Sequence, residues 1–428
     1  MISKLETERN PWYYLVLLIL AGEAVFILPF VLPRIFRPTV LDVFNLDNTQ
    51  LGLCFSVYGI TAILSYLFGG PIADTYAPRK LIAIALWTTA IGGFVFAHRP
   101  SFSTLQFLYG YWGFTTIFLF WAPMIKATRV WGGTLSQGKA FGLLDGGRGL
   151  TGALFGILGV FIFSLFMTGR MDAAMANERQ DAFRYVIYST TGIIFLIGIL
   201  VWFFMKAGGD EKQVQLERIS VRQISNVLKL PSVWLLMVII LCAYVGYKIT
   251  DILSQYAREI LQYGEVKSAE VGTFIQILRP ATGIIVGLLV DRYSIILWLV
   301  WSFIITAIGG VLFASGLIPP SGSVLYFLSV ICVATGVYAG RALYFGVMSK
   351  GQIPLTLTGT AVGIVSLIGY TPDIFAGPAY GYLLDTNPGE LGYQYVFRML
   401  VGFAVIGGGA AFLYHRMYGT KTIKPSLD

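Results

Sequence analysis

Charged residues are scarce in this 428-residue sequence, since Asp, Glu, Lys and Arg make up only 12% of it. A soluble domain carries about 25% charged residues, so an ordinary soluble protein is excluded. Histidine occurs twice, as His98 and His415, and cysteine three times. Two distant histidines provide no metal-binding cluster. The cysteines lie within apolar runs, where we interpret them as small packing residues without a disulfide role.

Long apolar runs fill most of the chain, and 56% of its residues are hydrophobic. Runs such as "PWYYLVLLILAGEAVFILPFVLP" are long enough to cross a ~30 Å hydrocarbon core as α-helices. The strict apolar and polar alternation of a membrane β-barrel strand is absent. The sequence therefore predicts an all-α polytopic membrane protein with twelve spans, near 11–33, 49–69, 79–97, 103–126, 139–167, 186–205, 232–256, 268–289, 294–317, 322–346, 357–384 and 394–418.

The first apolar run predicts a retained helix. It is too long for a signal-peptide core, no small-residue cleavage site follows it, and Glu23 lies in its middle. Lys and Arg gather in the segments that share the side of the N-terminus, which predicts that both termini are cytoplasmic. The net charge of +8 is then mainly an orientation signal, and nucleic-acid binding is a poor interpretation of it.

A polar segment at 206–231 separates six predicted spans from six others, which predicts two helical bundles, 1–205 and 232–428, joined by a cytoplasmic linker. Short matches recur between the halves, about 220 residues apart. "GGPIAD" pairs with "VGLLVD", and "GKAFGL" pairs with "GTAVGI". These matches occur in the same order in both halves, which favours a duplicated six-helix unit in parallel orientation.

The loop "GGPIADTYAPRK" resembles the signature of the major facilitator superfamily, with Thr75, Ala77 and Pro78 as departures from it. This resemblance covers essentially the whole chain. It implies transport by alternating access, with the acid of this loop and its copy in "GLLVDRY" acting as a conformational latch. The alternative is a solvated turn whose bases only fix the topology. The predicted latch residues are Gly70, Asp74, Arg79, Lys80, Asp291 and Arg292.

Charges inside predicted spans are costly and are expected to line a cavity or to be paired. Glu23 has no base within one helical turn, so it is a candidate proton carrier; the alternative is a permanently protonated, hydrogen-bonded group. A contact of Glu23 with Lys248 of the other half is a further hypothesis. The predicted proton-coupling residues are Glu23, Asp145, Asp251 and Asp373.

Asp145 and Asp251 each lie three residues from a base, Arg148 and Lys248, so each pair could instead be a purely structural ion pair. Guanidinium groups bind carboxylate, sulfonate or phosphate, and aromatic side chains provide stacking walls, although each aromatic could equally be packing. The predicted substrate-binding residues are Arg148, Arg279, Lys248, Tyr111, Trp121, Tyr247 and Tyr370.

The region "SVYGITAILSYLFGGPIAD" and these arginines are similar to the branch of the superfamily that carries organic anions, organophosphates and sugar acids. That branch places an arginine in helices one and seven, where Glu23 and Lys248 stand here. The resemblance therefore favours proton symport of an organic anion or zwitterion by a monomeric secondary transporter of the cell membrane, the bacterial inner membrane. An organophosphate-type anion exchanger and a non-transporting substrate sensor remain alternatives.

An enzyme and a cofactor are not expected. A membrane-embedded transferase would need a cluster of His, Asp or Glu at one membrane interface, and the sequence contains none. The glycine-rich "GGRG" is not preceded by a strand or followed by Gly-Lys-Ser/Thr, so it does not predict a phosphate-binding loop.

Overall fold

The computed structural model describes residues 11–132, 137–167, 174–205, 221–290, 294–319, 323–351, 353 and 358–419. Within these ranges the regular secondary structure is entirely helical, and no strand occurs. The chain divides into two compact units. The first contains Met1–Leu46 and Val57–Leu216, and the second contains Asp47–Ser56 and Glu217–Asp428. The long helix α4 (Asn48–Thr75) therefore contributes its first residues to the second unit.

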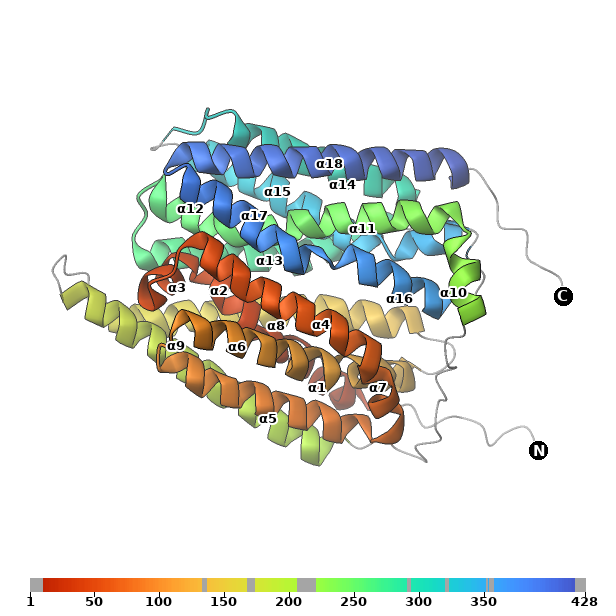
Figure 1. Cartoon of the computed structure of the whole chain (residues 1–428), viewed down its shortest axis with the longest axis horizontal. Coiled ribbons are helices and arrows are strands. Elements are labelled where there is room, and N and C mark those ends of the chain that lie inside the picture. The colour runs from red at the N-terminus through yellow and green to blue at the C-terminus, as the bar shows by residue number, and fades with distance from the viewer. Residues whose placement is uncertain are drawn as a thin grey trace. The chain divides into compact units, whose positions relative to one another are not determined.

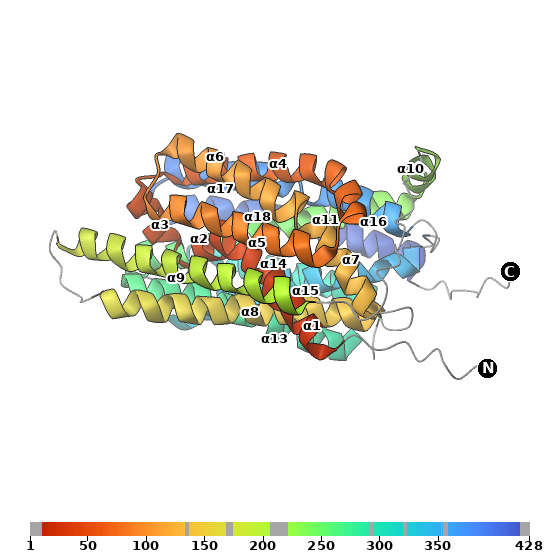
Figure 2. The same cartoon turned by 90° about the horizontal axis from the view of Figure 1, so that it is seen from below.

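The other elements of the first unit are α1 (Trp12–Phe26), the π-helix η1 (Ile27–Val31), α2 (Leu32–Ile35), α3 (Arg37–Phe44), α5 (Pro78–Ala97), α6 (Phe102–Gly113), the π-helix η2 (Phe114–Phe118), α7 (Trp121–Gly132), α8 (Gln137–Phe166) and α9 (Ala174–Phe204). Within this unit α5 packs along α9, and α1 packs along α8 (Figures 1 and 2). The fully buried Trp112 donates its indole N–H to the carbonyl of Thr89 at 3.2 Å, which ties α6 to α5.

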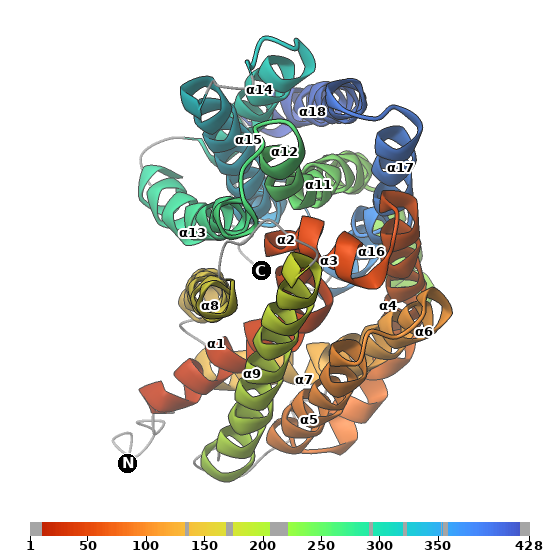
Figure 3. The same cartoon turned by 90° about the vertical axis from the view of Figure 1, so that its left-hand side faces the viewer.

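The elements of the second unit are α10 (Val221–Leu228), α11 (Pro231–Ile249), the 3₁₀ turn η3 (Thr250–Ile252), α12 (Leu253–Glu259), α13 (Glu265–Val290), α14 (Ile295–Ala314), α15 (Ser323–Leu343), the 3₁₀ segment η4 (Gly346–Gly351), α16 (Thr358–Gly369), α17 (Pro372–Thr386) and α18 (Glu390–Tyr418). Helix α14 packs against both α15 and α18, and the three lie together in Figure 3. Helix α11 packs along α18.

Ten helices among the described residues are long and apolar enough to cross a membrane. The other two predicted spans are interrupted: one consists of α6, η2 and α7, and the other of α16 and α17. The prediction of an all-α polytopic membrane protein is confirmed, and the helix of the predicted span 357–384 is broken between α16 and α17. A proline at the first position of α17, Pro372, explains this break, because proline cannot donate a backbone N–H to continue the preceding helix.

Two helix interruptions lie next to polar residues of the second unit. The backbone N–H of Thr371 bonds to Ile368 and that of Asp373 to Tyr370, so the chain makes tight turns between α16 and α17. The 3₁₀ turn η3 similarly interrupts the path from α11 into α12 and begins two residues after Lys248. Such interruptions free backbone groups and redirect side chains, and in membrane proteins they are tolerated where they lie inside the protein or line a cavity.

Candidate functional site

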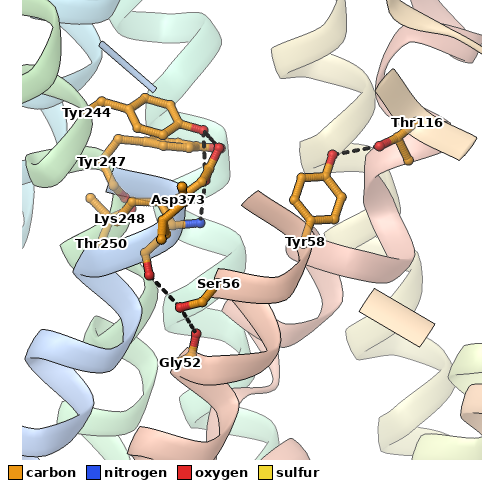
Figure 4. A network of polar contacts seen from close by, with 10 residues as sticks. Gly52, Ser56, Tyr58, Thr116, Tyr244, Tyr247, Lys248, Thr250 and Asp373 are labelled. Atoms are coloured by element: carbon orange, nitrogen blue, oxygen red, sulfur yellow. Dashed lines mark hydrogen bonds and ion pairs between the residues drawn. The ribbon is translucent and has the colours of Figure 1, made fainter. Parts of the chain in front are cut away.

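A buried ion pair joins the two interrupted helices of the second unit. Lys248 Nζ lies 3.1 Å from Asp373 Oδ1, and the exposed fractions of the two side chains are 1% and 13%. The Tyr244 hydroxyl, one turn before Lys248, donates to both oxygens of Asp373, at 3.2 and 3.1 Å. Figure 4 shows the lysine and the tyrosine converging on the carboxylate from α11. An ammonium and a phenol thus share one carboxylate in a nearly dry environment.

The first residues of α4 pack on this ion pair within the second unit. Lys248 Nζ lies 4.8 Å from the ring centroid of Phe55, a cation–π contact. The Ser56 hydroxyl contacts the carbonyl of Ile374, next to Asp373, and also donates to the carbonyl of Gly52 at 3.2 Å (Figure 4). A Cβ added to Gly52 would lie less than 3.0 Å from the backbone of Gly377, so α4 and α17 meet backbone to backbone.

A second cationic group, Arg341 near the end of α15, lies beside the same tyrosines. Its guanidinium carbon is 3.7 Å from the ring centroid of Tyr247 and 5.5 Å from that of Tyr244. Its electrostatic neighbours also include Tyr344 and Tyr370, whose hydroxyl oxygens are 3.4 Å apart. We call Tyr244, Tyr247, Tyr344 and Tyr370 the tyrosine cage. Arg341 Nη1 is buried and has no hydrogen-bond partner among the described residues.

In the first unit, a different arginine is paired. Arg148 Nε on α8 lies 3.4 Å from Glu23 Oε2 on α1 and donates to the carbonyl of Gly22 at 2.9 Å. The rings of Phe26 and Trp121 lie 5.5 and 5.8 Å from the guanidinium carbon. The Glu23 side chain is only 3% exposed, so the ion pair neutralises a carboxylate that would be costly to bury alone.

The predicted pair of Asp145 with Arg148 occurs at 4.0 Å, but the Asp145 side chain is 62% exposed, so this acid lies at the surface of the unit. Glu23 and Lys248, hypothesised to contact each other, each have an ion-pair partner within their own unit, Arg148 and Asp373. The charge of each of these two buried side chains is therefore neutralised by a partner in its own unit.

The remaining predicted residues are more scattered. Asp251 is buried in η3, and Arg279 is half-buried on α13. The Tyr111 hydroxyl donates to the carbonyl of Thr88 at 2.7 Å. Arg79 Nη1 lies 3.5 Å from the carbonyl of Trp202, and Lys80 is exposed. The structure does not describe the surroundings of Gly70 or the side chain of Asp74, and Asp291 and Arg292 lie outside the part of the chain that it describes.

Asp385, near the end of α17, caps the beginning of α4 within the second unit. Its carboxylate accepts hydrogen bonds from the backbone N–H groups of Asn48 at 3.1 Å and Thr49 at 2.7 Å, and from their side chains at 3.0 and 2.6 Å. A carboxylate at a helix N-terminus also compensates the partial positive charge there. Burial raises the pKa of Asp385, but these four hydrogen bonds outweigh it and lower the pKa below its ordinary value of 3.8.

Because the pKa of Asp385 is lowered, its contribution to stability is complete above the ordinary value and is lost only as the pH falls through the lowered one. We expect Asp385→Ala to lower the free energy of unfolding by about 1–3 kcal/mol. This difference between the wild type and the variant should be the same at every pH from ~5 to 8. Thermal unfolding of the purified chain in detergent measures this. The exposed Asp181, paired with Arg184 of its own helix at 3.4 Å, offers Asp181→Ala as the control. Equal effects of both substitutions would contradict the cap.

The sequence indicated Arg341 as a base and Tyr244 as an aromatic residue inside predicted spans but did not assign either to the site, and it did not indicate Asp385 at all. Arg341 was recognisable only as a base inside an apolar run, and Tyr344 lies three residues further along the chain, close to the expected helix face. No sequence signal marks Asp385, because its partners Asn48 and Thr49 lie 337 and 336 residues away.

The family model of the Major Facilitator Superfamily matches residues 13–377. The chain belongs to this superfamily. It is 27% identical over 411 residues to the inner membrane protein YqcE of Escherichia coli K12, covering 94% of each chain, and 24% identical over 409 residues to the inner membrane protein YihN of the same organism, covering 93% of this chain and 94% of the relative.

Solved structures of the superfamily share the fold. A bacterial homologue of the human lysosomal transporter Spinster, in an inward-facing and unoccupied conformation, superposes with a TM-score of 0.72 at 16% identity, over 97% of this chain and 98% of the other. The nucleoside transporter NupG gives 0.69 at 15% identity, over 95% and 100%. At these identities the similarity is one of fold. The resemblance found in the sequence is confirmed, and this membrane-embedded family makes a transporter the expected class of activity.

Proposed function

We propose that this protein is a secondary transporter that moves a small organic anion or zwitterion by alternating access, as a proton symporter. The observation that supports this best is the cluster of the buried Lys248 with the partly buried Asp373 and Arg341 among tyrosines at two interrupted helices. Ionisable groups inside a membrane domain are costly and are found mainly on substrate or proton pathways. The relatives named as inner membrane proteins support a location in the inner membrane. The gathering of Lys and Arg in the segments on the side of the N-terminus supports cytoplasmic termini.

Asp373 is the proton carrier in this proposal. While its carboxylate is ionised, it holds both the Lys248 ammonium and the Tyr244 hydroxyl. A proton taken up by Asp373 removes its charge and releases Lys248, which becomes available to an anionic solute. Loss of the proton restores the ion pair and expels the solute. Asp373 is chosen as the carrier because a buried ammonium and a phenol both contact its carboxylate.

Energy from the proton gradient is sufficient for accumulation. One charge moving down a ~100 mV potential yields about 2.3 kcal/mol, and each tenfold accumulation costs about 1.4 kcal/mol. Anion exchange is the second candidate, favoured by Arg341, because exchange needs a cationic site but no proton carrier. Asp74, Arg79, Lys80 and their copy at Asp291 remain the proposed conformational latch.

Flux in proteoliposomes tests the function. Liposomes containing the purified chain and a pH-sensitive dye receive an inward proton gradient and one of three solutes: gluconate, glycerol 3-phosphate or isethionate. We expect one of them to accumulate with additional acidification of the lumen, and a proton-conducting uncoupler to abolish this accumulation. Uptake that needs internal solute and ignores the gradient would indicate exchange. Binding without flux under any gradient would identify a sensor and contradict transport.

A further inference from the structure

We infer that Arg341 and the tyrosine cage form a binding subsite for the anionic group of a soluble solute, a carboxylate, phosphate or sulfonate. This inference deepens the proposed function. It rests on that function only in calling the ligand a substrate, because binding to the subsite does not require transport. Arg341 on α15 faces Tyr244 and Tyr247 of α11, Tyr344 beyond α15, and Tyr370 between α16 and α17. Three chain segments, α11, the end of α15 and the connection between α16 and α17, thus meet at one guanidinium.

Arg341 has no carboxylate partner among the described residues. All the contacts that the structure records for its guanidinium are with tyrosines, whereas Lys248 is held by Asp373. A buried guanidinium without an anion loses its hydration and gains little in return, which is unfavourable unless a ligand compensates the charge. The buried Nη1, which lacks a hydrogen-bond partner, is the atom at which such compensation is missing.

The stacking on Tyr247 decides which part of the guanidinium is available. With the guanidinium carbon 3.7 Å from the ring centroid, one face is covered by the phenol ring. The N–H groups of a guanidinium point outward in its plane, so stacking leaves its edge for a ligand. An edge with two parallel N–H groups matches the two oxygens of a carboxylate, phosphate or sulfonate group.

The cage adds neutral hydrogen-bond partners around this charge. The Tyr344 and Tyr370 hydroxyls are 3.4 Å apart, and the rings of Tyr244 and Tyr370 lie 4.9 Å centroid to centroid. Phenols both donate and accept hydrogen bonds, and their rings are flat apolar walls. This combination suits a solute that carries one anionic group beside hydroxyls or a small apolar body.

Ligand binding to the full-length chain in non-ionic detergent tests the subsite. Thermal stabilisation is titrated with three matched pairs of probes: gluconate and glucose, glycerol 3-phosphate and glycerol, and isethionate and ethylene glycol. We expect at least one anion to stabilise the protein and its neutral partner to have no effect. Arg341→Gln should weaken the apparent affinity about 10- to 100-fold, as loss of hydrogen bonds to a charged group predicts.

The control is Arg398→Gln, because Arg398 also lies over a tyrosine, 5.2 Å from the Tyr395 centroid, but is exposed on α18. Its affinity should equal that of the wild type. Arg341→Lys keeps the charge but not the planar edge and should bind with intermediate affinity, so it serves if Arg341→Gln does not fold. Unchanged anion affinity in either folded Arg341 variant, or no stabilisation of the wild type by all three anions, would overturn the inference.

A lipid headgroup offers the same chemistry as a soluble phosphate. Titration with phosphatidylglycerol in mixed micelles separates the two sources: stabilisation by the lipid alone, lost in Arg341→Gln, would overturn the assignment to a soluble solute. Failure of the proposed function is distinguishable. Arg341-dependent binding without any flux would support the subsite and contradict the proposed transport. Flux with Arg341-independent binding would support transport and contradict the subsite.

Discussion

Replacement of Asp373 by asparagine should abolish proton-driven accumulation and also destabilise the protein. The substitution leaves Lys248, which is 1% exposed, without the carboxylate that lies 3.1 Å from its ammonium. Removing one partner of a buried ion pair typically costs about 3–5 kcal/mol, because the other charge stays buried. We therefore expect a large drop in the thermal unfolding temperature in detergent, together with the loss of solute accumulation under a proton gradient.

A double variant separates the two effects. Asp373→Asn with Lys248→Met removes both charges, so most of the lost stability should return, since a buried pair replaced by similar apolar volume is often neutral. Proton-driven accumulation should stay absent, because neither the proton carrier nor the released ammonium remains. Recovery of accumulation in the double variant would contradict the role of Asp373 in coupling, and a single variant as stable as the wild type would contradict the ion pair.

Substitution of Gly52 by alanine should weaken the packing of α4 on α17 within the second unit. The new methyl group would lie less than 3.0 Å from the backbone carbonyl of Gly377, which cannot move aside as a side chain can. Overpacking of this kind costs about 1–3 kcal/mol. The contact of Ser56 with Ile374 lies one helical turn after Gly52, and the cap by Asp385 lies one turn before it. We therefore expect lower thermal stability and slower transport in proteoliposomes.

Gly402→Ala is the matched control, because Gly402 lies inside α18 and a Cβ there has no neighbour within 4 Å. Glycine inside a helix is less favourable than alanine by roughly 0.5–1 kcal/mol, so this control should be neutral or slightly stabilising. The two glycine substitutions are thus expected to differ in sign. If both substitutions shifted the thermal unfolding temperature with the same sign and size, the close approach of α4 and α17 would not be the reason why position 52 requires glycine.

The apolar runs predicted the helices well because membrane insertion depends on the composition of each segment alone. The sequence missed the interruptions, although Pro372 was visible, because proline inside an apolar run can begin a helix, kink it or break it. At the site, the i,i+3 spacing found the contact of Asp145 with Arg148, but Asp145 is exposed, and the closer partner of Arg148 is Glu23 on another helix. Spacing along one helix carries no information about the neighbouring helix.

The sequence by itself determined that this chain is an all-α membrane protein of the Major Facilitator Superfamily, because hydropathy, loop charge and the motif around Asp74 are local properties. Only the tertiary structure decided which buried charges neutralise each other. It pairs Glu23 with Arg148 and Lys248 with Asp373, and it leaves Arg341 among tyrosines. Electrostatic energies fall off over a few ångströms, so they depend on which helix faces meet after packing, and residues far apart in sequence set them.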